Sequence, residues 1–121
     1  ISKLKKSEKK FRLYINNSPD GVFVTNENGD YIEVNKEACN LTGYNEKELL
    51  TMNLSEICAA EHEEKAKKDF LKLKNKGEIS EEILFEKKNG DKYWMVVDAI
   101  KLSESRFLGF CKDITNLKKN N

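Results

Sequence analysis

The residues best able to do chemistry in this sequence are three cysteines and a single histidine. Cys39, Cys58 and Cys111 are odd in number and show no C-x-x-C spacing. His62 is the single histidine, so a metal cluster is not expected on ligand count. No nucleophile stands with an acid and a base in a catalytic pattern. We therefore predict a domain that is not an enzyme, with reduced thiols packed as small apolar groups.

Composition and charge narrow the class of protein further. The chain has 121 residues, enough for one domain, of which 38% are hydrophobic and 36% are charged. A net charge of +1 argues against nucleic acid as a partner, since nucleic-acid binding needs a concentrated basic face. No apolar stretch approaches the ~20 residues of a membrane span, and the N-terminal lysines fit a solvated helix face better than a membrane patch. We predict a cytoplasmic piece of a larger protein, without membrane contact of its own.

Hydrophobic spacing at the N-terminus predicts a helix that stands apart from the main domain. We assign residues 1–17 to this amphipathic flanking helix, residues 18–115 to the domain, and residues 116–121 to the start of a C-terminal linker. The helix has an apolar seam with one polar member, at Ile1, Leu4, Glu8, Phe11 and Ile15. A solitary helix of this length is marginal in water, so its seam needs a partner. That partner is either the domain's own sheet or a second subunit.

The rest of the chain reads as strands, then helices, then strands. Expected strands cover residues 21–25, 31–34, 81–86, 93–102 and 106–114, and the clearest helix covers residues 61–76. This order predicts an α+β fold, in which an antiparallel sheet has helices packed on one face.

Short polar signals mark where the helices begin and end. Asn35 is placed to cap a helix that Gly43 ends, and Gly77 ends the longer helix. Asn45 stands three residues before Glu48, the spacing of a capping box. These signals predict two short helices between the second strand and the long helix.

The expected strand 93–102 is apolar on both of its faces. Trp94, Val96 and Ile100 share one parity; Tyr93, Met95, Val97 and Ala99 share the other. A strand apolar on both sides has both faces covered, so the face away from the helices needs the N-terminal helix or a dimer mate. Asp98 interrupts one parity, and we expect it to point to water.

Six segments, taken together and in order, resemble a PAS domain, the sensory box of signalling proteins. They are Ser18-Pro19-Asp20-Gly21, Asn28-Gly29-Asp30 leading to Asn35, Leu41-Thr42-Gly43-Tyr44 with Glu48-Leu49, His62, Lys88-Asn89-Gly90 before Trp94, and Gly109 before Asp113-Ile114-Thr115. The resemblance covers nearly all of the chain after the first helix. It implies a five-stranded antiparallel sheet in the order 2-1-5-4-3, with short helices and one longer helix on one face.

The resemblance also implies a function in signal transduction. Domains of this family receive a ligand or partner and pass a conformational bias to a helix at one end. Asn35 would be a structural cap, and Asp113, Ile114 and Thr115 would hand the last strand to an output helix. Ile114, Leu117 and Asn121 continue that helix at coiled-coil spacing. The implied parent is a histidine kinase of a two-component system, with the kinase domain downstream.

Two cofactors of related domains are not expected here. Haem-binding relatives use a histidine within the long helix, whereas His62 sits at its first turn, where a cap or rim residue is the simpler interpretation. Flavin-binding relatives carry a reactive cysteine just after a position that corresponds to Asn53. Leu54 stands there, and Cys58 comes later. The identity of any ligand is left open.

A ligand pocket would lie between the long helix and the sheet. Its candidate walls are Phe70, Leu73, Ile83, Phe85, Trp94, Val96 and Phe110. The same residues could instead fill the core, whereas a metabolite needs about 300 Å³ or more. Two functions therefore compete: a small-molecule sensor, and a ligand-free relay that dimerises through the N-terminal helix and the sheet face. A homodimer is expected.

Overall fold

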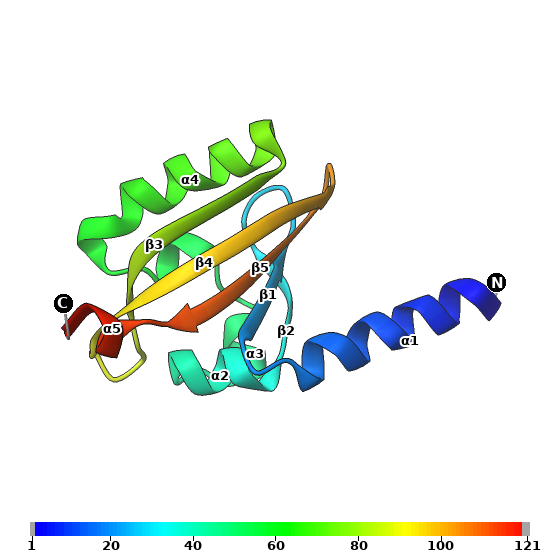
Figure 1. Ribbon diagram of the computed structural model, residues 1–121, viewed down its shortest axis with the longest axis horizontal. Helices are drawn as coiled ribbons and strands as arrows, with labels where there is room; N and C mark the ends of the chain where they lie inside the picture. The colour runs from blue at the N-terminus through cyan, green and yellow to red at the C-terminus, as the bar shows by residue number, and fades with distance from the viewer. Residues whose placement is uncertain (1, 120–121) are drawn as a thin grey trace.

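Five strands form one antiparallel sheet in the spatial order β2-β1-β5-β4-β3 (Figure 1). They are β1 (Gly21–Thr25), β2 (Tyr31–Val34), β3 (Glu78–Glu86), β4 (Lys92–Ser103) and β5 (Arg106–Asp113). The computed structural model describes residues 2–119, with side chains from 9 to 118. The predicted strand order and fold class are confirmed.

The helices are α1 (Ser2–Asn17), α2 (Lys36–Thr42), α3 (Glu46–Leu49), α4 (Glu63–Lys76) and α5 (Thr115–Lys119), with 3-10 turns η1 (Leu54–Glu56) and η2 (Ala60–His62). Between β2 and β3 the chain forms α2, α3, η1, η2 and α4, and α4 runs along the sheet (Figure 1). The helix α1 leaves the domain at the start of β1 and extends beyond its body (Figure 1).

The predicted helix boundaries are confirmed where local chemistry sets them. The side chain of Asn35 accepts from the backbone N–H of Ala38 at the start of α2. Asn45 and Glu48 form the reciprocal capping box of α3. Gly77 ends α4 at φ 91°, in the left-handed region that favours glycine. The strand β3 begins there at once, three residues earlier than expected.

The main core lies between the sheet and α2, α3, η1 and α4. Leu49, Ile57 and Met95 are among its fully buried side chains. Of the two apolar parities of β4, the one that contains Tyr93, Met95 and Ala99 is buried on this side. Trp94 and the other even-numbered residues of β4 therefore face the opposite side of the sheet.

The helix α1 covers only part of that opposite side. Ile15 is buried against Val22, Val24 and Leu108, so this cover lies over β1 and β5. On β4 the outward-facing Ile100 remains 41% exposed, and Asp98 points to water as expected. The far end of the expected seam and of the C-terminal coiled coil, Ile1 and Asn121, lie outside the described residues, as do the side chains of Leu4 and Glu8.

Candidate functional site

A cavity of about 90 Å³ lies between α4 and the inner face of the sheet. Four of the seven predicted wall residues line it: Phe70 and Leu73 from α4, and Ile83 and Phe85 from β3. The remaining walls come from β1, β2, β4, β5, η1 and the segment around Cys58. The site is therefore assembled from almost every element of the core.

The other three predicted wall residues lie elsewhere, and for them the prediction was wrong. Trp94 and Val96 border an open groove on the far side of β4, and Phe110 packs beside the cluster around Ile15. Val97 and Ala99 line the cavity in place of Trp94 and Val96. Side chains alternate along a strand, so choosing the wrong parity moved two residues of β4 to the wrong face.

A signal for the correct parity was present in the sequence. Asp98 interrupts the parity of Trp94 and Val96, whereas the alternate residues from Tyr93 to Ala99 form an unbroken apolar series. The face interrupted by a carboxylate is the one that water reaches, because an unpaired buried charge is costly. Assigning the parity that contains Asp98 to the outer face of the sheet would have placed Val97 in the cavity.

Thr25 is a polar residue of the wall, and its buried hydroxyl oxygen has no protein partner. Its side chain is 6% exposed, and Phe23 two residues earlier faces the same cavity. Among the side chains that the structure describes, Thr25 Oγ1 and the Tyr93 hydroxyl are the buried oxygen atoms without a hydrogen bond. Sequence analysis missed Thr25, because a threonine in a strand usually indicates β-propensity alone.

Two cysteine thiols also face the cavity. Cys58 donates a weak hydrogen bond to the carbonyl oxygen of Leu54 at 3.4 Å. Burial, reinforced by Glu63, raises the pKa of the Cys58 thiol to about 12. Burial also raises the pKa of Cys111. Both groups are therefore neutral thiols near neutral pH, whereas a redox-sensing cysteine needs a lowered pKa. The expected role of Cys111 as a core residue agrees with its burial.

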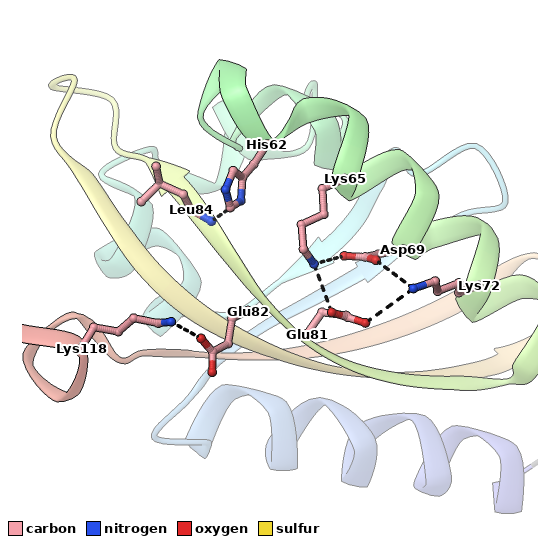
Figure 2. A network of polar contacts seen from close by, with 8 residues as sticks. All are labelled: His62, Lys65, Asp69, Lys72, Glu81, Glu82, Leu84 and Lys118. Atoms are coloured by element: carbon pink, nitrogen blue, oxygen red, sulfur yellow. Dashed lines mark hydrogen bonds and ion pairs between the residues drawn. The ribbon is translucent and has the colours of Figure 1, made fainter. Parts of the chain in front are cut away.

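Asp69 is a buried carboxylate in the cavity wall, and two lysines neutralise it. Lys65 Nζ lies 2.8 Å from Asp69 Oδ2 and 3.1 Å from a carboxylate oxygen of Glu81, and Lys72 approaches both acids more distantly (Figure 2). Partial burial lowers the pKa of Lys65, but hydrogen bonds to Asp69 and Glu81 outweigh this and raise it. This network joins the middle of α4 to the edge strand β3.

His62 contacts the edge of the sheet and does not line the cavity. Its Nδ1 accepts the backbone N–H of Leu84 at 3.0 Å (Figure 2). Its ring also meets the Trp94 ring edge-on, with centroids 5.3 Å apart. His62 stands at the N-cap position directly before α4, but its side chain bonds to β3 and forms no cap hydrogen bond.

Asn35 is more than a helix cap. Its Oδ1 accepts from the backbone N–H groups of Val22 and Ala38, both at 2.9 Å. Its Nδ2 donates to the carbonyl oxygens of Ile15 at 2.6 Å and Asp20 at 3.0 Å. One buried side chain therefore joins the end of α1 to β1 and α2.

The C-terminal exit is held against the start of β4. Trp94 donates its backbone N–H to Thr115 Oγ1, and its carbonyl oxygen accepts the N–H of Ile114, both at 2.9 Å. Asp113 Oδ1 accepts the N–H of Thr115 at 2.9 Å, which begins α5. Lys118 of α5 pairs with Glu82 (Figure 2) and lies over the Trp94 ring. We call these contacts of Trp94, Ile114, Thr115 and Lys118 the exit latch.

The size of the cavity limits what it can hold. Pockets for drug-sized ligands measure about 300–1,000 Å³, and this one measures about 90 Å³. A flavin or haem ring system would enter only if α4 moved away from the sheet. In residues 2–119, no group of three His, Cys, Asp or Glu side chains is placed to hold a metal ion.

Comparison with protein families matches residues 19–116 to the PAS domain. The chain belongs to the PAS domain family. Its sensory and regulatory role follows from this membership, and PAS domains themselves are non-catalytic. No curated protein matches the sequence. No helix in the described part of this PAS domain is long and apolar enough to cross a membrane.

Solved structures agree with this assignment. A domain of a sensory box sensor histidine kinase/response regulator from Geobacter sulfurreducens is similar, with TM-score 0.81 and 23% identity over 91% of this chain and 96% of that one. A PAS domain from Colwellia psychrerythraea gives TM-score 0.83 and 22% identity over 91% and 98% of the chains. A PAS domain from a two-component sensor histidine kinase gives 0.71 and 26% over 90% and 98%.

Proposed function

We propose that this PAS domain is a cytoplasmic sensor that binds a small ligand between α4 and the sheet and transmits its occupancy to a downstream histidine kinase. The observation that carries the proposal is the short contact path from the cavity wall to the exit latch. Residues 18–115 would form the sensor, residues 1–17 its flanking helix, and residues 116–121 the start of the output linker. The downstream partner would lie in the same chain.

Two routes lead from the cavity to the latch. In the first, the cavity-lining Phe85 packs edge-on against Tyr93, with centroids 6.0 Å apart, and Tyr93 adjoins Trp94 in β4. In the second, His62, which directly precedes α4, packs against the Trp94 ring. Movement of β3 or α4 on ligand binding would reach the backbone groups that hold Thr115.

The energy of the exit latch is similar in size to the typical coupling energy between two sites. Coupling between sites is typically about 1–3 kcal/mol. The latch contains two hydrogen bonds at the Trp94 backbone, one donated to Thr115 Oγ1 and one accepted from the N–H of Ile114, each contributing about 1 kcal/mol. A ligand that weakened or strengthened the latch by this amount would change the population of a released α5 severalfold to a hundredfold.

The histidine kinase parent rests on similarity to PAS domains of sensor histidine kinases. The test is autophosphorylation of the full-length protein with ATP. Ala66 lines the cavity, so Ala66→Leu fills space that a ligand would occupy. Kinase activity in this variant is expected to stay constant and not to respond to the ligand. Leu71 is exposed on α4, and Leu71→Ala is the control expected to respond normally. A normal response in Ala66→Leu, or a protein without kinase activity, would refute the corresponding part of the proposal.

A second candidate function is a homodimeric relay without a small ligand. The outer face of β4 supports it, because Ile100 and Leu102 are 41% and 44% exposed and α1 covers only β1 and β5. The extension of α1 beyond the domain offers a further contact surface (Figure 1). Ile100→Glu should abolish self-association in sedimentation velocity, whereas Leu71→Glu, an equally polar change on the outside of α4, should not. An unchanged dimer in Ile100→Glu would exclude this face.

A further inference from the structure

The unpartnered hydroxyl of Thr25 lies in a cavity wall that is otherwise almost wholly apolar. Threonine hydroxyls both donate and accept, and buried ones almost always find a partner. Two other polar side chains of the wall are engaged, since Asp69 pairs with Lys65 and Cys58 donates to Leu54. Thr25 Oγ1 is a fully buried wall oxygen at which a guest in the cavity can form a hydrogen bond without displacing an existing contact.

Water alone fits this cavity poorly. A buried water needs two to four polar partners, and each water occupies about 30 Å³ in the liquid. A cavity of about 90 Å³ would hold about three waters. They would share the Thr25 and Tyr31 hydroxyls and the weakly bonding Cys111 thiol. An apolar body with one polar atom satisfies the same wall better.

The volume sets the size of that body. An apolar cavity of about 150 Å³ accepts benzene, which has six non-hydrogen atoms. In proportion, 90 Å³ accommodates about four non-hydrogen atoms. Charge is excluded, because an anion would face the Asp69 carboxylate and a cation would have to displace Lys65 from it.

We propose that the cavity selects a small uncharged molecule of about four non-hydrogen atoms, with a single oxygen that hydrogen-bonds to Thr25. Short-chain alcohols, ketones and aldehydes belong to this class. The inference rests on the proposed sensory function and names the class of ligand for the same cavity. The Thr25 hydroxyl fixes the orientation of the guest, and the surrounding apolar residues Ile83 and Leu73 limit the size of guest that the cavity accepts.

Acetone and xenon are suitable probes, because both are small and only acetone has a hydrogen-bonding oxygen. Binding is followed by the NMR shifts of the Leu73 and Ile83 methyl groups, which line the cavity. In the native domain we expect both probes to shift these signals. Thr25→Val keeps the β-branched shape and removes the hydroxyl, and it should weaken acetone about tenfold while xenon binds as well as before. Thr25→Ser retains the hydroxyl and should retain acetone binding.

Thr42→Val is the matched control for removal of a buried threonine hydroxyl. Thr42 is also fully buried, but its hydroxyl donates to the carbonyl oxygen of Ala38 and it lies outside the cavity. It should lower the melting temperature and leave acetone affinity unchanged. Equal acetone affinity in native protein and Thr25→Val would overturn the proposal. So would unshifted cavity methyl groups with both probes, which would mean that side chains close the cavity.

The same probes separate this inference from the proposed function. If acetone binds through Thr25 but leaves kinase activity of the full-length protein unchanged, the ligand class stands and signal transmission from the cavity is refuted. If Ala66→Leu alters kinase activity while acetone does not bind, transmission stands and the ligand class is refuted.

Discussion

Replacement of Asn35 by alanine removes four hydrogen bonds that join three elements of the fold. Two of the lost bonds are accepted from Val22 and Ala38, and two are donated to Ile15 and Asp20. The side chain is 2% exposed, so water does not readily replace it. The N–H groups of Val22 and Ala38 would remain buried without the side-chain acceptor. The carbonyl oxygen of Ile15 also accepts the N–H of Ser18, and that of Asp20 is only partly buried.

The expected loss of stability follows from this count. Loss of a helix cap costs about 1 kcal/mol, and each backbone group left unsatisfied in the interior costs about 1–3 kcal/mol. Local relaxation and entry of water reduce the sum, so we expect Asn35→Ala to lower the free energy of unfolding by about 3–5 kcal/mol. A domain of this size has about 5–15 kcal/mol in total. The melting temperature should fall by roughly 10–25 °C.

Urea unfolding, followed by circular dichroism and by the fluorescence of Trp94, measures the change. Asn45 provides a matched control, because it also caps a helix but is solvent-accessible and makes only capping-box contacts. Asn45→Ala should cost about 1 kcal/mol. Asn35→Asp keeps the acceptor oxygen but turns a carboxylate oxygen toward the carbonyl oxygens of Ile15 and Asp20, so it should destabilise the domain at least as much as Asn35→Ala.

The difference between the Asn35→Ala and Asn45→Ala variants isolates the bonds that are not part of the cap. If Asn35→Ala destabilised the domain no more than Asn45→Ala, the bonds to Val22, Ile15 and Asp20 would contribute nothing. The assignment of Asn35 as the joint between α1 and the domain would then be wrong.

Three further predictions concern the exit, the buried thiols and α1. Asp113→Ala removes the acceptor for the Thr115 N–H. It should uncouple kinase output in the full-length protein and lower the free energy of unfolding by about 1 kcal/mol. Asp113→Asn should retain output, and normal signalling by Asp113→Ala would contradict the prediction. The pKa values of Cys58 and Cys111 are raised above those of unfolded thiols, so their stabilising effect is complete below pH 9 and is lost as pH rises toward about 12. Urea unfolding at several pH values should show stability falling by up to ~1.4 kcal/mol per pH unit for each thiol, and Cys58→Ala should reduce that slope; an unchanged slope would mean that Cys58 ionises normally. Deletion of residues 1–16 should weaken self-association, and sedimentation that showed the same dimer would argue against a role for α1.

Several features of the fold could be predicted because they depend on neighbours in sequence. The helix cap at Asn35, the capping box at Asn45 and the stop at Gly77 each involve residues within a few positions. The strand order followed from the family resemblance and is confirmed. The four predicted wall residues that line the cavity are apolar positions on α4 and β3, whose inward faces are clear from periodicity.

The remaining features of the site depend on contacts between distant segments. Whether Trp94 or Val97 faces the cavity depends on which side of the sheet the helices cover, because both parities of β4 are largely apolar. The partners of Asn35 on α1 and β1, and those of Asp69 on β3, likewise come from other elements. Local spacing carries no information about these pairings.

The sequence by itself determined the class of this protein, its element order and its helix ends, since short-range periodicity and capping are local properties. Only the tertiary structure decided that the cavity is about 90 Å³ and that the hydroxyl of Thr25 stands in its wall without a partner. The physical reason is that a cavity is the space left after side chains from many elements have packed. Its volume and the unpartnered Thr25 hydroxyl are therefore properties of the assembled core.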